Sequence, residues 1–243
     1  MALTFDIIDH PTLASTNDEA RRLAEEGGRE GLVVRAARQT AGRGRQGRPW
    51  ISEDGNLFLS ILLRPEVPMA QVATLPFVAA TALADTLAPR MADTAGLTLK
   101  WPNDVLVGGR KISGILLESG GSRLGLWVVV GIGVNIVSHP PETLHPATSL
   151  KAAGIEWSRE ALTDSYLRVF GNLYQTWLGH GFSPIRRAWL RRAAHLGKHI
   201  TVARGEERLT GLFEDVDETG ALHLRLGDGS ETIITAGDVF LGE

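Results

Sequence analysis

The sequence contains no cysteine, which excludes disulfide bonds, thiolate nucleophiles and cysteine-ligated metals. Its N-terminus lacks the basic and apolar regions of a secretory signal, and no later apolar run reaches the length we expect of a bilayer-spanning helix. Neither a Walker phosphate loop nor a G-x-S-x-G nucleophile elbow is present. His195 and His199 lie four residues apart, but Gly197 separates them and no third ligand is evident, so we predict no metal held by protein side chains. We expect a cytoplasmic protein with no membrane partner.

The charge pattern is more informative than the total charge. The net charge of -3 argues against a general nucleic-acid binder, whose affinity depends on neutralising phosphates. Between Glu30 and Glu53, however, the chain has no acidic residue and carries Arg35, Arg38, Arg43, Arg45 and Arg48. This cluster predicts a local anion site within an acidic protein.

The hydrophobic pattern predicts an α+β fold, a mixed β-sheet with helices on one face. We expect strands at residues 32–34, 57–63, 97–101, 104–107, 111–118 and 127–135, and helices from Thr16 toward Gly27, at 75–87, from Arg159 through Trp177, and at 185–194. Thr16 and Glu19 resemble a capping box at the start of the first helix. Short alternating strands at 199–203, 209–213, 221–226 and 231–234 predict a small β-barrel. We therefore divide the chain into a catalytic domain, 1–195, and a small C-terminal domain, 196–243.

The segment from Gly42 to Arg48 is the strongest local signal. It matches the dinucleotide pattern G-x-G-x-x-G, but Pro49 and Trp50 follow it where that pattern requires a helix. Arginines between glycines instead suit a mobile loop that closes over phosphate oxygens, because glycine allows close backbone approach and arginine gives forked hydrogen bonds. Taken alone, the segment also fits a solvated basic loop or an RNA-contacting segment.

Lys111 is the candidate cation of a second motif, which follows Lys100-Trp101-Pro102-Asn103-Asp104. Strand alternation places it on the same face as Ser113 and Ile115, where a lysine is costly unless an anion meets it. Gly114 in the same strand indicates close approach by a ligand or by backbone. Considered alone, Lys111 also fits an exposed strand lysine.

Glycines alternate with apolar residues in Gly131-Ile132-Gly133-Val134-Asn135, at the end of an apolar strand. Missing side chains on one face leave room for a flat ligand, and the Asn135 amide is suited to reading a base edge. A bulge or bend in the strand explains the same glycines.

Together and in order, these segments resemble the biotin protein ligase family. The resemblance rests on Ser15-Thr16-Asn17, the segment from Gln39 to Arg48, Lys100 to Asp104, Gly109 to Gly114, and Gly131 to Asn135. It implies a synthetase-like catalytic domain and an SH3-like C-terminal barrel. It also implies that biotin and Mg-ATP form biotinyl-5'-AMP, and that a lysine of a biotin carboxyl carrier protein then accepts the biotin.

The resemblance assigns a role to each motif. Lys111 and Arg45 become the catalytic residues, with Lys111 bridging the biotin carboxylate and the α-phosphate. The implied biotin-binding residues are Ser15, Thr16, Asn17, Gln39, Arg43, Gly44, Arg45, Lys111, Gly114 and Leu116, with Ile112 as a further apolar candidate. The implied ATP- and adenylate-binding residues are Arg43, Arg45, Arg48, Trp50, Asn103, Asp104, Lys111, Gly133 and Asn135. Asp104 is a candidate for orienting the lysine or magnesium.

Bifunctional members of that family carry a DNA-binding module before the Ser15-Thr16-Asn17 motif. Here the motif begins almost at once, so we expect a ligase without a DNA partner. The resemblance allows a homodimer paired through the central sheet, and the sequence does not distinguish it from a monomer. The alternatives are a lipoate or octanoate ligase, which shares the adenylation logic, and a nucleic-acid-binding regulator that uses its arginine loop on phosphates.

Overall fold

The computed structural model describes residues 3–141, 143 and 146–241, and in that part of the chain the strands form two sheets. The larger, seven-stranded sheet contains β1 (Asp6–Leu13), β2 (Leu32–Gln39), β3 (Leu57–Leu63), β4 (Leu97–Lys100), β5 (Asp104–Val107), β6 (Arg110–Ser122) and β7 (Gly125–Val134). Its strand order is β1-β2-β3-β7-β6-β5-β4. The β1–β2 pair is parallel and the other pairs are antiparallel, so the predicted mixed sheet is confirmed.

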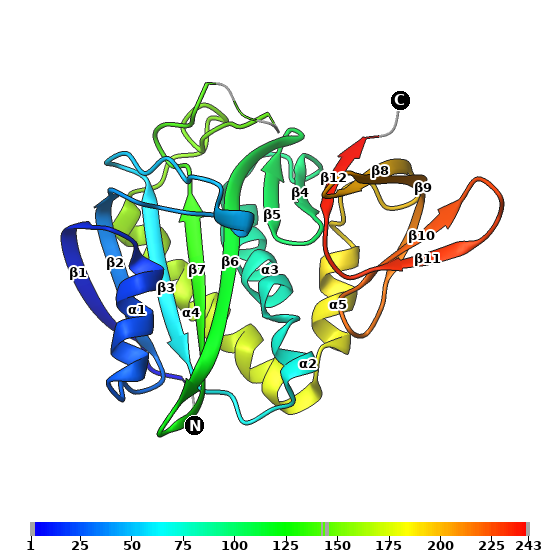
Figure 1. The fold of residues 1–243 in the computed structure, drawn as a ribbon. Coiled ribbons are helices and arrows are strands. Elements are labelled where there is room, and N and C mark those ends of the chain that lie inside the picture. The colour runs from blue at the N-terminus through cyan, green and yellow to red at the C-terminus, as the bar shows by residue number, and fades with distance from the viewer. Residues whose placement is uncertain (1–2, 142, 144–145, 242–243) are drawn as a thin grey trace.

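The smaller sheet is antiparallel and has five strands in the order β11-β10-β9-β8-β12. Its strands are β8 (His199–Arg204), β9 (Glu207–Val216), β10 (Leu222–Leu226), β11 (Glu231–Ile234) and β12 (Asp238–Leu241). Figure 1 shows it beside the β4 edge of the larger sheet. The Trp101 indole Nε1 donates to the carbonyl of Gly220 at 2.9 Å, which ties the two sheets together.

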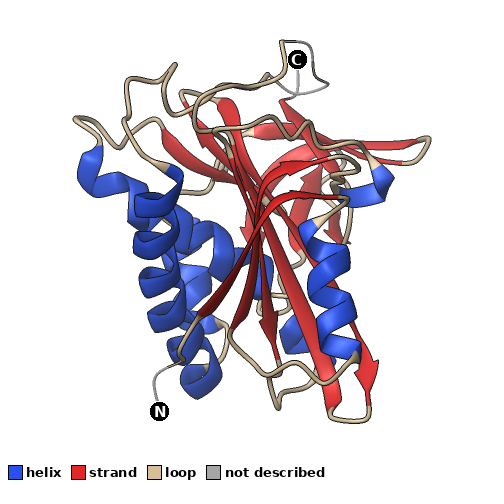
Figure 2. Cartoon of the chain, turned by 90° about the vertical axis from the view of Figure 1, so that its left-hand side faces the viewer, coloured by secondary structure: helices blue, strands red, loops and turns tan. Residues whose placement is uncertain are grey.

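Helices cover both faces of the larger sheet, which corrects the expectation of one face (Figure 2). They are α1 (Thr16–Glu25), α2 (Met69–Val72), α3 (Leu75–Leu87), α4 (Arg159–His180) and α5 (Ser183–Leu190). α1 packs on one face through Ala20 and Ala24, against Leu62 and Val129. The main core, with α3 and α4, lies on the other face. The sheet needs both covers because its interior strand β3 is buried along its whole length.

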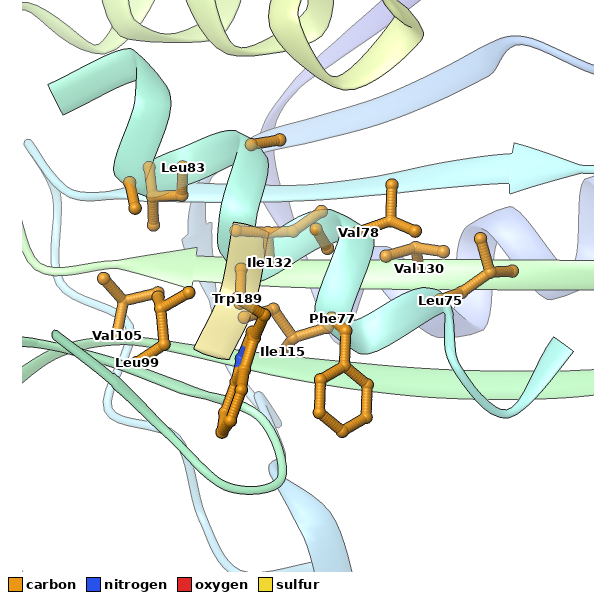
Figure 3. Close-up of a cluster of buried hydrophobic side chains, with 14 of the residues drawn as sticks. Leu75, Phe77, Val78, Leu83, Leu99, Val105, Ile115, Val130, Ile132 and Trp189 are labelled. Carbon is orange, nitrogen blue, oxygen red and sulfur yellow. The ribbon is translucent and has the colours of Figure 1, made fainter. Parts of the chain in front are cut away.

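The helix α3 is buried on almost every side and lies against β4 to β7 (Figure 3). Together with its flanking turns, residues 69–90 have the length of a bilayer-spanning helix, and an apolar window of 18 residues within them has a mean hydropathy of 1.4, so the expectation that no run would reach that length was wrong. The apolar window is 72% buried inside the protein, as in the core helix of a globular domain.

The start of α1 differs from the predicted capping box. Ser15 is the N-cap residue, and its side chain makes no capping hydrogen bond. Thr16 is already helical, and its hydroxyl lies 3.1 Å from the Gln39 side-chain oxygen, while Glu19 pairs with Arg22. The hydroxyl at this helix end is therefore directed toward the sheet and its loops.

A β-bulge in β6 changes which side chains share a face with Lys111. The β5–β6 register shifts between Val105 and Leu106, so Ile112 and Ile115, three residues apart, both enter the main core. The predicted alternation, with Ile115 on the face of Lys111, is therefore wrong. The prediction that Ile112 lines a ligand pocket is also wrong, because its side chain is fully buried in the core.

Candidate active site

A pocket of about 330 Å³ opens where the first turn of α1, the loop after β2 and the ends of β5, β6 and β7 meet. Apart from Ile112, every residue given a site role by the sequence analysis contributes to its lining. The chain brings these motifs together because β3, β7 and β6 are adjacent in the sheet. The motifs therefore line one pocket, although Ser15 and Asn135 lie 120 positions apart in the sequence.

Lys111 projects into this pocket and is paired with Asp104. Its ammonium lies 2.6 Å from the Asp104 carboxylate, and the Asp104 side chain is only 9% exposed. The ammonium also lies 5.4 Å from the centre of the Trp50 ring, a cation–π distance. Asp104 therefore fixes the lysine head at the pocket wall, which fits the predicted orienting role.

The glycine-arginine loop, residues 42–50, folds back on itself as a small hairpin. The amide of Gly44 donates to the Arg48 carbonyl at 2.7 Å, and that of Trp50 donates to the Gly42 carbonyl at 2.9 Å. A short 3-10 turn at Arg45–Gly47 forms its tip. Arg43, Arg45 and Arg48 of the loop all line the pocket, so they are close to any ligand inside.

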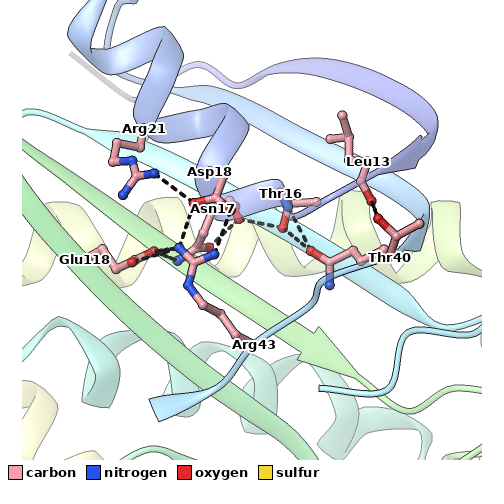
Figure 4. Close-up of polar contacts among 10 residues, drawn as sticks. Leu13, Thr16, Asn17, Asp18, Arg21, Thr40, Arg43 and Glu118 are labelled. Atoms are coloured by element: carbon pink, nitrogen blue, oxygen red, sulfur yellow. Dashed lines mark hydrogen bonds and ion pairs between the residues drawn. The ribbon is translucent and has the colours of Figure 1, made fainter. Parts of the chain in front are cut away.

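The three loop arginines have different surroundings. Arg43 is fixed by two carboxylates, since its guanidinium pairs with Asp18 at 2.8 Å and with Glu118 at 3.0 Å (Figure 4). These hydrogen bonds, that to Asp18 first, hold the pKa of Arg43 above its usual value. Arg43 therefore anchors the loop to α1 and β6 in this conformation.

Arg45 is the loop cation that has no carboxylate partner among the residues that the structure describes. Among the described residues its only hydrogen bonds, both 3.4 Å long, are to the Asn103 side chain and the Gly237 carbonyl. Burial lowers the pKa of Arg45, which means that the site disfavours its charge unless an anion is bound. Arg48, in contrast, is paired with Asp238 of β12.

Polar side chains of α1 and β2 form the opposite end of the pocket. The Thr16 backbone amide donates to the Gln39 side-chain oxygen at 2.8 Å, and the Gln39 amide donates to Ser52 at 2.9 Å. Asn17 donates to Glu118 at 2.6 Å. Among the described residues no hydrogen-bond partner of the Ser15 hydroxyl is present, so it is available to a ligand. This end suits a small polar head group.

The glycines of β7 make room for protein side chains. A Cβ at Gly131 would lie 2.1 Å from the Asn17 oxygen, and one at Gly133 would lie 2.6 Å from the Trp50 indole. The expectation that these gaps hold a flat ligand directly is therefore corrected. They let Asn17 and Trp50 lie flat on the sheet and form the pocket floor, together with Gly114 and Leu116 of β6.

Both asparagines predicted to contact adenine are engaged with backbone. The Asn103 amide donates to the Ile115 carbonyl at 2.7 Å, and the Asn135 amide donates to the Thr148 carbonyl at 3.0 Å. Each amide nitrogen uses one of its two hydrogens in this way. The second hydrogen and the side-chain oxygen of each residue remain for other partners.

Several site residues were missed by the sequence analysis. The lining also includes Pro49, Ile51, Pro140, Thr143, Ala147 and Asp238. Behind the lining, Ser60 and Glu118 hold Asn17. Ser60 could have been found from the sequence, because its hydroxyl in the otherwise apolar strand 57–63 must have a hydrogen-bond partner. Asp238 gave none, because only the fold brings β12 to the loop.

Comparisons with known proteins give a consistent family. The biotin/lipoate A/B protein ligase family model matches residues 11–135, and the biotin protein ligase C-terminal domain model matches residues 195–242. The biotin--[acetyl-CoA-carboxylase] ligase of Paracoccus denitrificans is 42% identical over 94% of this chain and 97% of its own length. The bifunctional ligase/repressor BirA of Bacillus subtilis is 35% identical over 97% of this chain and 74% of its own length. The structure of the Aquifex aeolicus biotin protein ligase in complex with biotin and ATP has a TM-score of 0.81 at 28% identity and covers 97% of both chains.

Proposed function

The chain belongs to the biotin/lipoate A/B protein ligase family, with the C-terminal domain of biotin protein ligases, and from this premise we propose how its pocket works. The protein is a biotin ligase that activates biotin with ATP as biotinyl-5'-AMP and transfers the biotin to a protein lysine. The observation that carries the assignment of residues is the presence of two cations in one pocket. Lys111 is held by Asp104, and Arg45 is partly buried and has no carboxylate partner within the described part of the chain.

Activation brings two anions together. A biotin carboxylate oxygen attacks the α-phosphorus, the bond from that phosphorus to the bridging oxygen breaks, and pyrophosphate leaves. Lys111 stabilises the negative charge shared by the carboxylate and the phosphoryl oxygens, and Arg45 supplies a second positive charge from the loop above. The net gain is largest in the transition state, because there the two anions are closest.

Transfer then uses the mixed anhydride as an acyl donor. The amine of the acceptor lysine attacks the biotinyl carbonyl carbon, loses a proton, and AMP leaves with the carbon–oxygen bond electrons. We propose that the acceptor belongs to a biotin carboxyl carrier protein. The glycine-arginine loop protects the anhydride from water until that lysine arrives, since Arg43 and Arg48 fix the loop on both sides of the pocket.

The pocket has a polar end at α1 and β2 and another end at Trp50, and this difference suggests how the substrate is oriented. We propose that Ser15, Thr16 and Gln39 bind the ureido head of biotin, and that Gly114 and Leu116 contact its rings and chain. Trp50 then faces the adenylate. We propose that Arg48, Asn103, Gly133 and Asn135, which also line the pocket, surround the adenylate with it.

Magnesium enters this scheme as part of the substrate Mg-ATP. Among the described residues there is no group of three or more histidine and carboxylate side chains able to form a protein metal cage. Asp104 is a carboxylate that lines the pocket, and magnesium is commonly held by one carboxylate plus substrate phosphates. We propose that Asp104 contributes in this way as well as through Lys111, and that the bound ion neutralises phosphate charge.

A pyrophosphate exchange assay with biotin, lipoate and octanoate tests the proposal. Of the three acids, we expect only biotin to stimulate pyrophosphate exchange. Exchange stimulated only by lipoate or octanoate would assign the chain to the related branch of the family. A nucleic-acid-binding function is disfavoured by the loop itself, because Arg43 and Arg48 are both paired with carboxylates. Tight, strongly salt-dependent DNA binding in a mobility-shift titration would contradict that conclusion.

A further inference from the structure

Asn56, just before β3, is buried and directs its side chain at the segment that follows β7. Its side-chain oxygen accepts from the backbone amides of Ile136, Val137 and Ser138, at 2.8, 2.9 and 3.2 Å. Its side-chain nitrogen donates to the carbonyl and to the hydroxyl of Ser138, both at 3.1 Å. The oxygen and the amide hydrogens of Asn56 are therefore all used on three consecutive residues, although Asn56 itself does not line the pocket.

The three amides make this attachment costly to lose. Consecutive backbone amides that converge on one point form a concave site of the kind that holds anions, and here the Asn56 oxygen fills it. Ile136 is buried, so water does not readily replace a lost acceptor at its amide. The start of the post-β7 segment, which we define as residues 136–141 and 146–148, therefore depends on Asn56 for its position.

The other end of the post-β7 segment is attached to the backbone of Lys111. The Lys111 amide donates to the Pro146 carbonyl at 2.8 Å, and the Lys111 carbonyl accepts from the Thr148 amide at 2.9 Å. Ala147, between them, pairs with Lys111 as a parallel β-bridge and lines the pocket. A displacement of this segment therefore moves part of the pocket wall and the main chain that carries Lys111.

We propose that Asn56 is a positioning residue for adenylation, which holds the post-β7 segment where the pocket wall and Lys111 meet ATP. The inference rests on the proposed function, because it takes Lys111 as the residue that meets the α-phosphate. Asn56 acts through the segment and not by contact with a substrate. Its loss affects the end of the pocket next to Lys111 and spares the polar end, which is built from α1 and β2.

Asn56→Ala tests the proposal, because it removes the acceptor of the three amides. The KM for ATP, measured by pyrophosphate exchange at saturating biotin, is expected to rise about tenfold, since a misplacement of about 1 Å near reacting groups costs up to about 100-fold. The Kd for biotin, measured by titration calorimetry, is expected to change by less than about twofold, because distant sites act independently.

Asn56→Asp is the rescue variant. A carboxylate keeps an acceptor for the three amides and loses only the donors to Ser138, so the KM for ATP is expected to stay near that of the wild type. A KM as high as that of Asn56→Ala would contradict the role of the side-chain oxygen.

A merely structural role of Asn56 predicts a different pattern. KM does not depend on the amount of folded protein, so a loss of stability alone leaves the KM for ATP unchanged. That result, or equal weakening of both substrates, would overturn the proposal. Hydrogen exchange without substrates gives a second measurement. In Asn56→Ala the amides of Ile136, Val137 and Ser138 are expected to exchange faster while those of β3 do not, and unchanged exchange at the three amides would also refute it.

Gly55→Ala displaces the same segment from the other side, should Asn56→Ala not fold. Gly55 has a φ of 88°, and a Cβ there would lie 2.5 Å from the Val137 side chain. Gly229→Ala is the matched control, since Gly229 has a φ of 85° and its Cβ would meet no atom within 4 Å. A higher KM for ATP is expected in Gly55→Ala only, and equal KM values in the two variants would refute the proposal. A wild type without biotin-dependent exchange of pyrophosphate would instead refute the proposed function itself.

Discussion

Arg48 of the glycine-arginine loop forms an ion pair with Asp238, the first residue of β12 in the smaller sheet. At the other end of the loop, Arg43 is paired with Glu118 of β6 in the larger sheet. The loop therefore spans the pocket and is fastened to both sheets. The C-terminal sheet thereby contributes directly to the position of the loop over the ligand site.

The Arg48–Asp238 pair is predicted to act by holding the loop and to have a small energetic effect. The Arg48 side chain is 44% exposed, and ion pairs of such exposure contribute up to about 1 kcal/mol. Arg48→Ala and Asp238→Asn are each expected to raise the apparent Kd for ATP by about two- to fivefold, which corresponds to that energy. Kd values from ATP titrations of both variants and of the double variant check this.

The double variant separates loop fastening from direct phosphate binding. If the pair only fastens the loop, the double variant is as weak as either single variant, because both substitutions remove one interaction. A loss of ATP affinity in Arg48→Ala far larger than in Asp238→Asn would show instead that Arg48 contacts the nucleotide directly.

Lys111→Ala is predicted to reduce biotinyl-5'-AMP formation by about 100-fold or more, because removing a donor aimed at developing charge has that effect. The loss is expected in kcat, since the charge that Lys111 stabilises is greatest in the transition state. Stability changes less, by about 1 to 3 kcal/mol, as the Asp104 carboxylate loses a charged hydrogen-bond partner. Single-turnover adenylation and thermal unfolding measure the two effects.

The matched control is the double variant Lys111→Met and Asp104→Asn. This double variant removes the Asp104 carboxylate that Lys111→Ala leaves unpaired. It should therefore recover the stability lost in Lys111→Ala but not the adenylation activity. Near-normal adenylation in Lys111→Ala would exclude the lysine from the mechanism.

Arg45→Gly is predicted to increase release of biotinyl-5'-AMP from the protein. The variant removes the loop cation that has no carboxylate partner among the described residues, and with it a charge available to the adenylate. Released adenylate is measured by trapping with a free amine. Gln46→Gly is the control, because it adds a glycine to the same loop without removing a cation, and Gln46 already has a positive φ of 57°. Equal leakage from both variants would attribute the effect to loop flexibility.

Local patterns in the sequence predicted much of the fold. Strands β3, β5 and β11 and the helix α3 have the predicted bounds, because each has a clear apolar period and a turn signal at its end. The strand β1, in contrast, was missed. Its exposed side chains and Pro11 give no strand pattern, and its place at the sheet edge depends on parallel pairing with β2 and on ion pairs such as that of Asp9 with Arg35.

The site residues that belong to local sequence motifs could be predicted. Those that reach the site through contacts between distant segments could not. The Lys111 and Arg45 positions follow from motifs, and both line the pocket. The bulge in β6, the contact of Asp238 with the loop and the place of Trp50 over Gly133 depend on register and on strands far apart in the sequence. A period-two pattern contains no information on such contacts.

The stability of the protein is predicted to rise with pH between about 8 and 10.5 through Lys100. Burial against the C-terminal sheet lowers the pKa of Lys100 from 10.5 to about 8, although Asp104 opposes the shift. In this range the unfolded chain binds more protons than the native one, so raising the pH favours the native state. The gain is a few kcal/mol at most, since one pKa unit corresponds to about 1.4 kcal/mol.

Lys100→Met removes this titration and leaves the other groups in place. The difference in unfolding free energy between wild type and variant, measured in urea at pH 7.5 and pH 9.5, is therefore expected to change in favour of the wild type at the higher pH. A difference that does not vary with pH would show that Lys100 titrates at its ordinary pKa.

Gly133→Ala is predicted to displace Trp50 and to weaken ATP binding more than biotin binding. The new Cβ would lie 2.6 Å from the indole nitrogen of Trp50, too close for any real contact, so the ring must move off β7. Trp50 lies beside Lys111, and its movement should change both tryptophan fluorescence and the Kd for ATP, by about tenfold if a stacking contact is lost. Gly121→Ala is the matched control, because a Cβ there meets no atom within 4 Å. Since Gly121 lies in the same antiparallel pair of strands, it reports any general cost of replacing a strand glycine. If the two variants bind ATP equally well, the close approach of Trp50 to Gly133 has no function in nucleotide binding.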